Sequence, residues 1–316
     1  MSDASASATP PLVLGMGELL WDVFPDHEAP GGAPANVAFH ARQLGLSATV
    51  CSRVGDEDRG DRLLHHLESH GIDPRLVQRD PAHDTGTVTV DVNDPEAPAY
   101  LIHEDVAWDH VEWTPDLARV LERTRALAFG TLAQRSPTTR ETLWRALEAL
   151  PQEALGVYDV NLRPPWYQKD WIHRSLELAS IAKYSVSEDD VLARLFGLSG
   201  DSVEANARTL LQRFGLEWVC VTKGGVGSVI VTPDETVQSP GHSHPAVEGA
   251  DAVGAGDAFT ASIIRARLDG WPPDAAGELA NRVAALVAAH PGATPDVRDG
   301  VDGIREEVRA RHGLGD

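Results

Sequence analysis

Short apolar stretches alternate along this chain with stretches whose apolar residues recur at helical spacing. Strands are expected at residues 12–17, 48–54, 126–129, 157–160, 181–186 and 218–222. Helices are expected at residues 34–44, 62–70, 138–150, 171–179, 203–214 and 255–268. Strands and helices in alternation form a parallel sheet with helices on both faces. The pattern therefore predicts one α/β domain over residues 11–316, with a central, mostly parallel sheet in a three-layer α/β/α arrangement.

One segment, residues 84–108, interrupts this alternation. Polar and apolar side chains alternate with a period of two over residues 85–92 and 99–103, and residues 93–98 between them are turn-like. This pattern predicts a β-hairpin with one exposed face. A lone hairpin is marginally stable, so it must lean on another part of the protein. We interpret it as a lid over an active site or as half of a dimer clasp; an extension of the main sheet is the alternative.

The N-terminal residues, the lack of a long apolar run and the two cysteines are typical of a cytoplasmic protein. Residues 1–10 are small and polar and are expected to form a disordered leader, because they lack the basic and apolar regions of a signal peptide. No apolar run approaches the about 20 residues that span a bilayer. Cys51 and Cys220 both lie in expected strands, where buried free thiols in a reducing compartment are the favoured interpretation.

The charge balance excludes several classes of partner. The chain carries 48 acidic and 27 basic residues, a formal net charge of −21, and only three of the basic residues are lysines. Such a surface repels nucleic acids and anionic membranes, so neither is expected as a partner. Two explanations of the acidic surface stay open: adaptation to high internal salt, or a GC-rich genome.

Residues 251–260 carry the most informative chemistry. Gly254, Ala255 and Gly256 stand at the start of an expected helix, where unpaired backbone N–H groups and the helix dipole attract anions. Asp257 follows them directly, and an acid beside an anion cradle suits a group that takes a proton from a hydroxyl attacking a phosphate. This stretch predicts phosphoryl transfer to an alcohol.

Three further groups lie near expected strand or helix ends. Asp22 follows the first strand, where open α/β sheets bind ligands. Gly31, Gly32 and Asn36 open the helix at residues 34–44, and the asparagine offers both a donor and an acceptor to sugar-like hydroxyls. Arg163 is a candidate contact for phosphoryl oxygens. Each group also has a structural interpretation: a solvated acid, an ordinary helix start or a salt bridge.

Other glycine and histidine patterns are less specific. The chain lacks the Gly-x-x-x-x-Gly-Lys-Ser/Thr sequence, which excludes a P-loop enzyme. The glycine turn at residues 223–227 lies between two strands, which argues against a dinucleotide fingerprint. His242 and His244, in a loop rich in proline and glycine, are expected to face solvent rather than to bind a metal.

In this order and spacing, the motifs resemble the PfkB/ribokinase-like family of carbohydrate kinases. The two signatures are Gly31-Gly32-x-x-x-Asn36 and the run from Asp251 to Asp257. The resemblance implies a ribokinase-like α/β/α fold with a small β lid, with Asp257 as general base and the N–H groups of residues 254–257 as an anion hole. It also implies sugar contacts from Asp22, Gly32, Asn36 and Arg163. Lys223, Gly224 and Gly227 would border ATP, and Asn281 would lie near the adenine.

The resemblance implies Mg²⁺ and a monovalent cation, K⁺, as well. The family's Asn-x-x-Glu element, tied to magnesium, aligns with residues 187–190, where Ser187 replaces the asparagine and Asp190 the glutamate. Magnesium dependence is therefore expected with altered geometry. The cation loop would lie near Asp251 and the turn at residues 289–294.

Two sequence runs, residues 17–22 and 159–163, narrow the choice of sugar substrate, because they resemble those of bacterial fructokinases. Kinases of 2-keto-3-deoxygluconate are similar too, but their lid offers tyrosines and an arginine to the substrate's carboxylate. The hairpin here has Val88, Tyr100 and His103, and no arginine. A neutral sugar, fructose first, is therefore favoured. The alternatives are a 2-keto-3-deoxygluconate kinase, a ribokinase, or an inactive regulatory protein that binds sugar or nucleotide.

Overall fold

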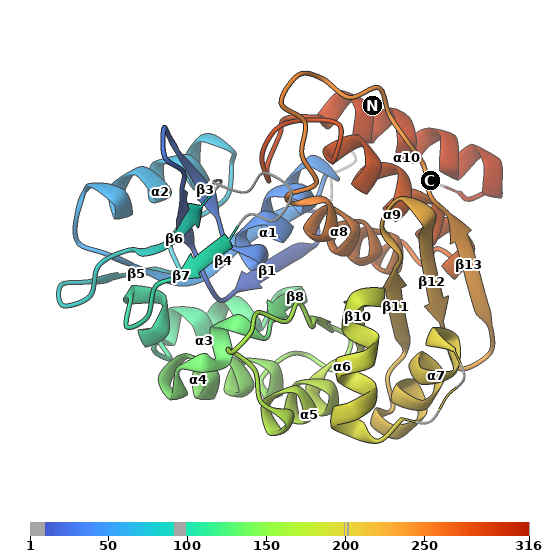
Figure 1. The fold of residues 1–316 in the computed structure, drawn as a ribbon, viewed down its shortest axis with the longest axis horizontal. Coiled ribbons are helices and arrows are strands. Elements are labelled where there is room, and N and C mark those ends of the chain that lie inside the picture. Colours follow the sequence, from blue (N-terminus) through green and yellow to red (C-terminus); the bar gives the residue numbers. More distant parts are fainter. Residues whose placement is uncertain (1–9, 92–98, 199, 201, 316) are drawn as a thin grey trace, which may run out of the picture.

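A nine-stranded sheet forms the centre of the protein (Figure 1). The computed structural model describes residues 10–91, 99–198, 200 and 202–315, so most of the expected leader lies outside the described residues. The strands run in the order β13-β12-β11-β10-β9-β8-β1-β4-β5. Their bounds are β1 Leu12–Met16, β4 Ser47–Gly55, β5 Val77–Asp80, β8 Thr124–Gly130, β9 Leu155–Asp159, β10 Ile181–Ser185, β11 Trp218–Thr222, β12 Gly227–Val231 and β13 Thr236–Pro240. Neighbours from β5 to β11 pair in parallel, and β12 and β13 add an antiparallel edge.

Helices cover both faces of this sheet, which confirms the predicted α/β/α architecture. The helices are α1 Ala33–Gln43, α2 Asp58–Ser69, α3 Pro115–Leu121, α4 Pro137–Glu148, α5 Lys169–Leu178, α6 Val186–Phe196, α7 Val203–Phe214, α8 Ala255–Leu268, α9 Pro273–Val287 and α10 Arg298–His312. Successive strand side chains point to opposite faces. On β8, accordingly, Ala126 and Ala128 pack in the core with α1, α8, α9 and α10, while Leu127 and Phe129 pack in the core with α3, α4, α5 and α7.

The expected hairpin is present, but it belongs to a second, four-stranded sheet. The order of this sheet, which we call the lid, is β3-β2-β6-β7, with β2 Leu20–Val23, β3 Glu28–Gly31, β6 Gly86–Asp91 and β7 Ala99–Ile102. The turn expected at residues 93–98 lies outside the described residues. The hairpin therefore does not extend the main sheet; it pairs through β6 with β2, directly after β1.

A small apolar cluster and a buried ion pair anchor the lid at its root. The cluster includes Leu20, Val88 and Trp108, of which the last lies in the short 3-10 helix η1, Ala107–His110. Beside it, Arg135 binds both carboxylate oxygens of Asp109 at 2.8 and 2.7 Å, and its guanidinium lies 3.9 Å from the Trp108 ring centroid. The side chains of Arg135 and Asp109 are only 5% and 6% exposed.

Both cysteines are buried and free, as expected. In the described part of the chain, none of the helices has the length and apolar character needed to cross a membrane.

Removing one partner of the buried ion pair tests this anchor. Arg135→Met keeps the apolar stem but leaves Asp109 buried without its cation, so we expect a loss of about 3–5 kcal/mol in the free energy of unfolding. The matched control is Arg119→Met, which breaks an exposed pair with Asp116 and should cost less than about 1 kcal/mol. Urea unfolding measures both. Equal losses in the two variants would contradict the anchoring role of Arg135.

Candidate active site

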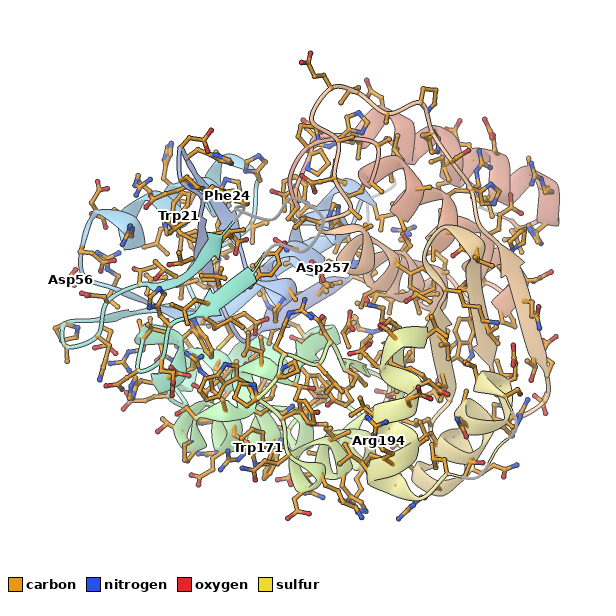
Figure 2. All side chains as sticks on the ribbon, viewed as in Figure 1. Trp21, Phe24, Asp56, Trp171, Arg194 and Asp257 are labelled. Atoms are coloured by element: carbon orange, nitrogen blue, oxygen red, sulfur yellow. The ribbon has the colours of Figure 1, made fainter. Side chains whose placement is uncertain are left out.

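A hydrogen bond between two distant segments defines the candidate site. Asp257 lies in the first turn of α8, near the middle of the molecule (Figure 2). Its Oδ2 accepts a hydrogen bond of 2.9 Å from Nδ2 of Asn36, which lies in the first turn of α1, 221 residues earlier. Both side chains are buried, at 9% and 7% exposure. The structure thus brings together the two stretches that the sequence analysis singled out.

Gly254 creates the sharp start of α8. It adopts the left-handed conformation with φ of 78°, which favours glycine. A Cβ there would lie 2.1 Å from the carbonyl oxygen of Ala293, so the close approach of these two loops also requires glycine. The first N–H groups of any helix lack partners within it. The start of α8 thus has the geometry of the predicted anion site, with the N–H group of Ala255 donating back to the carbonyl oxygen of Ala252 over 3.3 Å.

A buried ion pair lies directly beneath this helix start. Lys183, on β10, donates to both carboxylate oxygens of Asp159, at the end of β9, over 3.1 and 2.9 Å. Thr260 of α8 donates to the same carboxylate over 3.0 Å. A Cβ on Gly256 would lie 3.1 Å from the Lys183 ammonium, so this cation sits immediately behind the anion-binding turn. Burial alone would lower the pKa of Lys183, but the carboxylate of Asp159 raises it and keeps the ammonium charged.

The surroundings of Asp257 favour its protonated form near neutral pH. Burial, and next the neighbouring carboxylate of Asp159, raise the pKa of Asp257 to about 7. The hydrogen bond from Asn36 and the charges of Lys183 and Arg163 act in the opposite direction but do not cancel the effect. A carboxylate with a pKa near the working pH is well suited to take and release a proton.

Two further carboxyl groups, those of Glu18 and Asp22, also have raised pKa values. Burial raises the pKa of Glu18 to about 7 and that of Asp22 to about 6, and Arg163 lowers both. Gly31 leaves room for Asp22, because a Cβ there would lie 2.5 Å from the Asp22 carboxylate. Three acids thus share one nearby cation, the exposed guanidinium of Arg163.

A cavity of about 460 Å³ adjoins the start of α8. Gly224, Gly227 and Asn281, three of the residues expected to border a nucleotide, line it together with Ala255 and Gly256. Its remaining wall is mostly small and apolar, which suits a flat ring. The wall residues are Thr222, Gly225, Gly241, His242, Ser243, His244, Ala246, Ala252, Phe259, Ala284, Ala285, Ala288 and Ala289.

Several details of this cavity differ from expectation. His242 and His244 were expected to face solvent, yet both line the cavity. Burial lowers the pKa of each, so both are neutral near pH 7. The Asn281 amide donates to the backbone oxygens of Ser239 and Pro240, both over 3.1 Å, so it fastens β13 to α9. The ammonium of Lys223 turns to Glu204 over 2.9 Å.

Two further candidate residues, Tyr100 and Asp190, are exposed, the first on the lid and the second on α6. Tyr100 is 56% exposed on β7 of the lid. Asp190 is exposed on α6, whereas Glu188, two residues earlier, accepts hydrogen bonds from the backbone N–H groups of Leu162 and Ser185 over 2.5 and 2.7 Å. The acid of this segment that faces the strand ends is therefore Glu188.

Asp251 joins the two loops expected to form a cation site. Its carboxylate accepts hydrogen bonds from the backbone N–H groups of Val253 and Gly292, over 2.8 and 2.9 Å. Its own N–H donates to the carbonyl oxygen of His290 over 3.3 Å. The structure thus places Asp251 beside the turn at residues 289–294.

The sequence analysis missed Lys183 and Glu18 as members of the site. A lysine within an otherwise apolar strand, Ile181–Ser185, was the available signal for the first, because buried lysines need a partner. Glu18 follows β1 and reads as an ordinary loop acid until burial is known. In the described part of the chain its Oε2 is buried without a hydrogen-bond partner.

Known proteins of one family resemble this chain along most of its length. The sequence pattern described as pfkB family carbohydrate kinase matches residues 16–299. A fructokinase of Klebsiella pneumoniae is 31% identical over 287 residues, which are 84% of this chain and 87% of that protein. An uncharacterized sugar kinase of Pyrococcus horikoshii is 29% identical over 301 residues, 89% of this chain and 91% of that protein.

Solved structures agree in fold. The Pyrococcus sugar kinase in complex with ATP has a TM-score of 0.77 at 26% identity, covering 94% of this chain and 99% of its own. A fructokinase of Xylella fastidiosa with bound ATP has a TM-score of 0.79 at 19% identity, covering 94% and 98%. The similarity in fold thus extends over nearly the whole of each chain.

The raised pKa of Asp257 predicts how stability depends on pH. The folded protein holds this proton more tightly than the unfolded chain, so the wild type loses stability as the pH rises from 3.8 toward 7. Asp257→Asn removes the buried charge and should raise the free energy of unfolding by about 1–3 kcal/mol at pH 8, and by less at pH 5. Urea unfolding at both values checks this, with the exposed Asp234→Asn as control. A gain that does not grow with pH would contradict the raised pKa.

Proposed function

This chain belongs to the pfkB family of carbohydrate kinases, and we propose that it phosphorylates a neutral sugar, D-fructose to fructose 6-phosphate before any other. ATP is the phosphoryl donor of this sugar kinase family. The observation that carries the proposal is the hydrogen bond between Asn36 and Asp257, which unites both family signatures at the anion-binding start of α8. A sugar hydroxyl held at this point would meet a base on one side and a phosphoryl group on the other.

In this proposal Asp257 is the general base. Its carboxylate takes the proton of the attacking hydroxyl, and the hydrogen bond from Asn36 fixes the orientation of its Oδ2. With a pKa of about 7, the ionised fraction of Asp257 increases with pH through neutrality. We therefore expect kcat/KM to increase between pH 6 and pH 8.

The N–H groups of Gly254, Ala255, Gly256 and Asp257 bind the transferred phosphoryl group. Backbone donors held in place at a helix start stabilise developing negative charge without reorganising. The dipole of α8 and the charge of Arg163, which also acts on Asp257, add to this field. Asp22, Gly31, Gly32, Asn36 and Tyr100 are the proposed sugar contacts.

The cavity beside α8 is the proposed site of the adenine and ribose of ATP. Gly224 and Gly227 have positive φ values of 57° and 121°, and a Cβ on Gly224 or Gly225 would meet open space, so the cavity wall stays flat there. Asn281 keeps β13 against α9 and so shapes the wall. Lys223, held by Glu204, borders the entrance.

The family implies Mg²⁺ and a monovalent cation, and the residues present suit both. A divalent ion bound to ATP neutralises charge on the phosphates. Glu188, which faces the strand ends, offers oxygen of the kind Mg²⁺ prefers, through water, whereas Asp190, the position suggested by the sequence, lies exposed on α6. Asp251 holds two loops together whose backbone carbonyls would bind K⁺.

The charges near Asp257 support a neutral sugar. Glu18, Asp22 and Asp257 would repel an anionic substrate, and Arg163 is the one cation that lowers the pKa of all three. A sugar acid such as 2-keto-3-deoxygluconate would need more positive charge than this. The identity of 31% to a fructokinase supports fructose, and ribose is the second candidate.

Two finer proposals concern assembly and location. Tyr100 and Leu101 are 56% and 61% exposed on β7, which would suit a homodimer formed through the lid. The buried free thiols Cys51 and Cys220 suit a reducing cytoplasm.

Removing the carboxylate of Asp257 should slow the chemical step without weakening the binding of the substrates. Asp257→Asn is expected to lower kcat about 10²–10⁴-fold while ATP and sugar affinities change little, because the amide keeps the shape but cannot accept the proton. Coupled ADP release measures turnover, and calorimetric titration measures binding. A variant with most of its kcat would refute the role of Asp257.

A sugar panel tests the substrate and the regulatory alternative together. Fructose, ribose, glucose, 2-keto-3-deoxygluconate and adenosine are each assayed with Mg·ATP, at low and high potassium chloride. We expect the highest kcat/KM with fructose. Preference for the sugar acid would overturn the neutral-sugar proposal, and ATP binding without turnover on every sugar would favour the regulatory alternative.

A further inference from the structure

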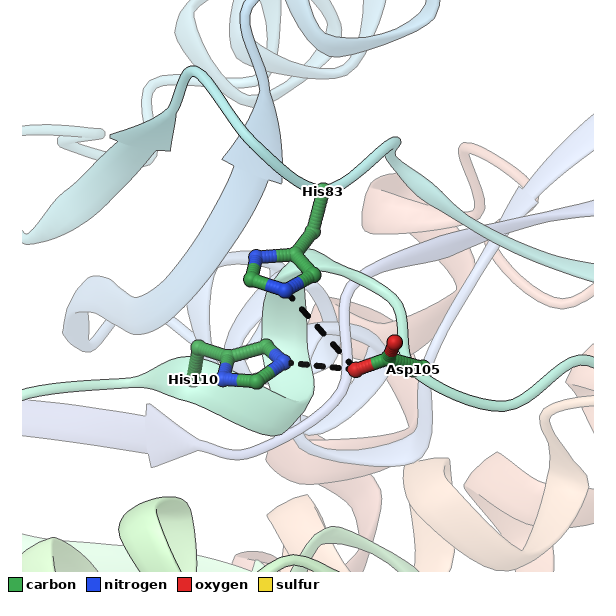
Figure 3. A group of neighbouring side chains, drawn as sticks. All are labelled: His83, Asp105 and His110. Carbon is green, nitrogen blue, oxygen red and sulfur yellow. Dashed lines mark hydrogen bonds and ion pairs between the residues drawn. The ribbon is translucent and has the colours of Figure 1, made fainter.

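Two histidines and one aspartate converge at the root of the lid (Figure 3). His83 lies in the loop that leads from β5 to β6, Asp105 follows β7, and His110 ends η1. The three residues therefore come from both ends of the segment that forms strands β6 and β7 of the lid. The phosphoryl-transfer proposal makes no use of them.

The ligand atoms of this cluster lie close together. Oδ1 of Asp105 is 3.7 Å from Nε2 of His83 and 3.1 Å from Nε2 of His110, and all three atoms lie within 4.8 Å of one another. Tetrahedral Zn²⁺ with bonds of about 2.0–2.1 Å holds its ligand atoms roughly 3.3 Å apart. The observed spacing thus differs from that of a bound site by an ångström or so.

A buried carboxylate orients one of the histidines. Oδ2 of Asp80 lies 3.0 Å from Nδ1 of His83, and the Asp80 side chain is 1% exposed. At this distance the Asp80 carboxylate, which also accepts hydrogen bonds from the N–H groups of Ala82 and His83, accepts the Nδ1 proton of His83. This leaves the lone pair of Nε2 facing Asp105, the arrangement usual for histidines that bind metals.

The charged side chains around His83, Asp105 and His110 favour the binding of a cation. Arg53 is the nearest cation, but it is engaged by Asp80 at 2.7 Å and by Glu112 at 3.4 Å. Asp105 itself is 80% exposed, and its side chain has room to move. It adopts φ of 53°, a left-handed conformation that aspartate and asparagine tolerate better than most residues.

We propose that His83, Asp105 and His110 form a binding site for one divalent transition-metal ion, with Zn²⁺ as the best match. Two imidazole nitrogens and one carboxylate oxygen suit Zn²⁺ and other borderline metals, whereas Mg²⁺ prefers oxygen alone. Solvent fills the fourth position, because both histidines are partly exposed, at 27% and 29%. The ion ties together the two ends of the β6–β7 segment and so stiffens the root of the lid.

Binding requires a small, defined rearrangement. The two rings now stack with centroids 3.7 Å apart and planes 15° apart, so their Nε2 lone pairs run side by side. They must tilt toward each other to share one ion, and Asp105 must release its contact with His110. Ligation also requires a free lone pair on Nε2 of His110.

The test uses the full chain without an affinity tag, freed of metal by a chelator. Calorimetric titration with ZnCl₂ is expected to show one site, with MgCl₂ giving no signal, and Zn²⁺ should raise the Tm. Co²⁺, used as a probe, should give visible absorption bands typical of tetrahedral coordination. His83→Gln, His110→Gln and Asp105→Asn should each weaken Zn²⁺ binding at least tenfold, the last while keeping the left-handed backbone.

Two control variants separate this site from other histidines. His27→Gln removes a surface histidine paired with Asp26 at 2.7 Å, and the double variant His242→Gln/His244→Gln removes the pair in the proposed nucleotide cavity. Both should keep full Zn²⁺ affinity. Absence of Zn²⁺ binding at 100 µM, or equal binding in the three site variants, would overturn the proposal. Failure of sugar phosphorylation would leave this test unaffected, because binding and Tm are its readouts.

Discussion

The buried ion pair between Lys183 and Asp159 is the interaction on which the candidate active site depends. It ties the ends of β9 and β10 to α8, through the hydrogen bond from Thr260. A buried charge is tolerated only when it is paired and hydrogen-bonded. Because this pair is complete, Asp257 can be buried one turn away without an ion-pair partner of its own. Its unusual pKa is therefore a property of the whole junction of sheet and helix.

Much of the fold follows from local patterns, and its exceptions have physical causes. The parallel strands other than β5 are buried on both faces and read as apolar runs, so their positions were predictable. Strand β5, Val77–Asp80, has polar side chains at three of its four positions and was not predicted. The strands Leu20–Val23 and Glu28–Gly31 were not, because they are only four residues long and the second contains Pro30. Leu20–Val23 pairs with Gly86–Asp91, more than fifty residues away, and Glu28–Gly31 adds to its other side; no local signal encodes the distant contact.

The residues of the candidate site also fall into two groups: those that a local motif indicates and those that only the folded structure brings together. Glycines and the acid at the start of α8 form a compact motif, so the sequence singled them out, but the hydrogen bond from Asn36 to Asp257 was not predicted. Lys183 and Glu18 acquire their importance only through burial, which depends on helices far away in the chain. Lys223 shows the converse: its motif pointed to the nucleotide, whereas Glu204, nineteen residues earlier, takes its ammonium group. Partner choice among charged side chains is decided by tertiary structure.

The acidic composition poses a problem for any protein that binds a nucleotide triphosphate, because a chain with net charge −21 repels it. The structure counters this repulsion with positive charge that is fixed at the start of α8. The N–H groups and dipole at the start of α8 and the guanidinium of Arg163 supply positive potential there, whereas the charge of the buried Lys183 is balanced by Asp159. Fixed dipoles and buried cations are screened by salt less than surface lysines are. Asp22 and Glu18, whose pKa values are raised by burial, are suited to hydrogen bonds with hydroxyl groups instead. One pole of the site thus suits phosphates and the other suits hydroxyl groups.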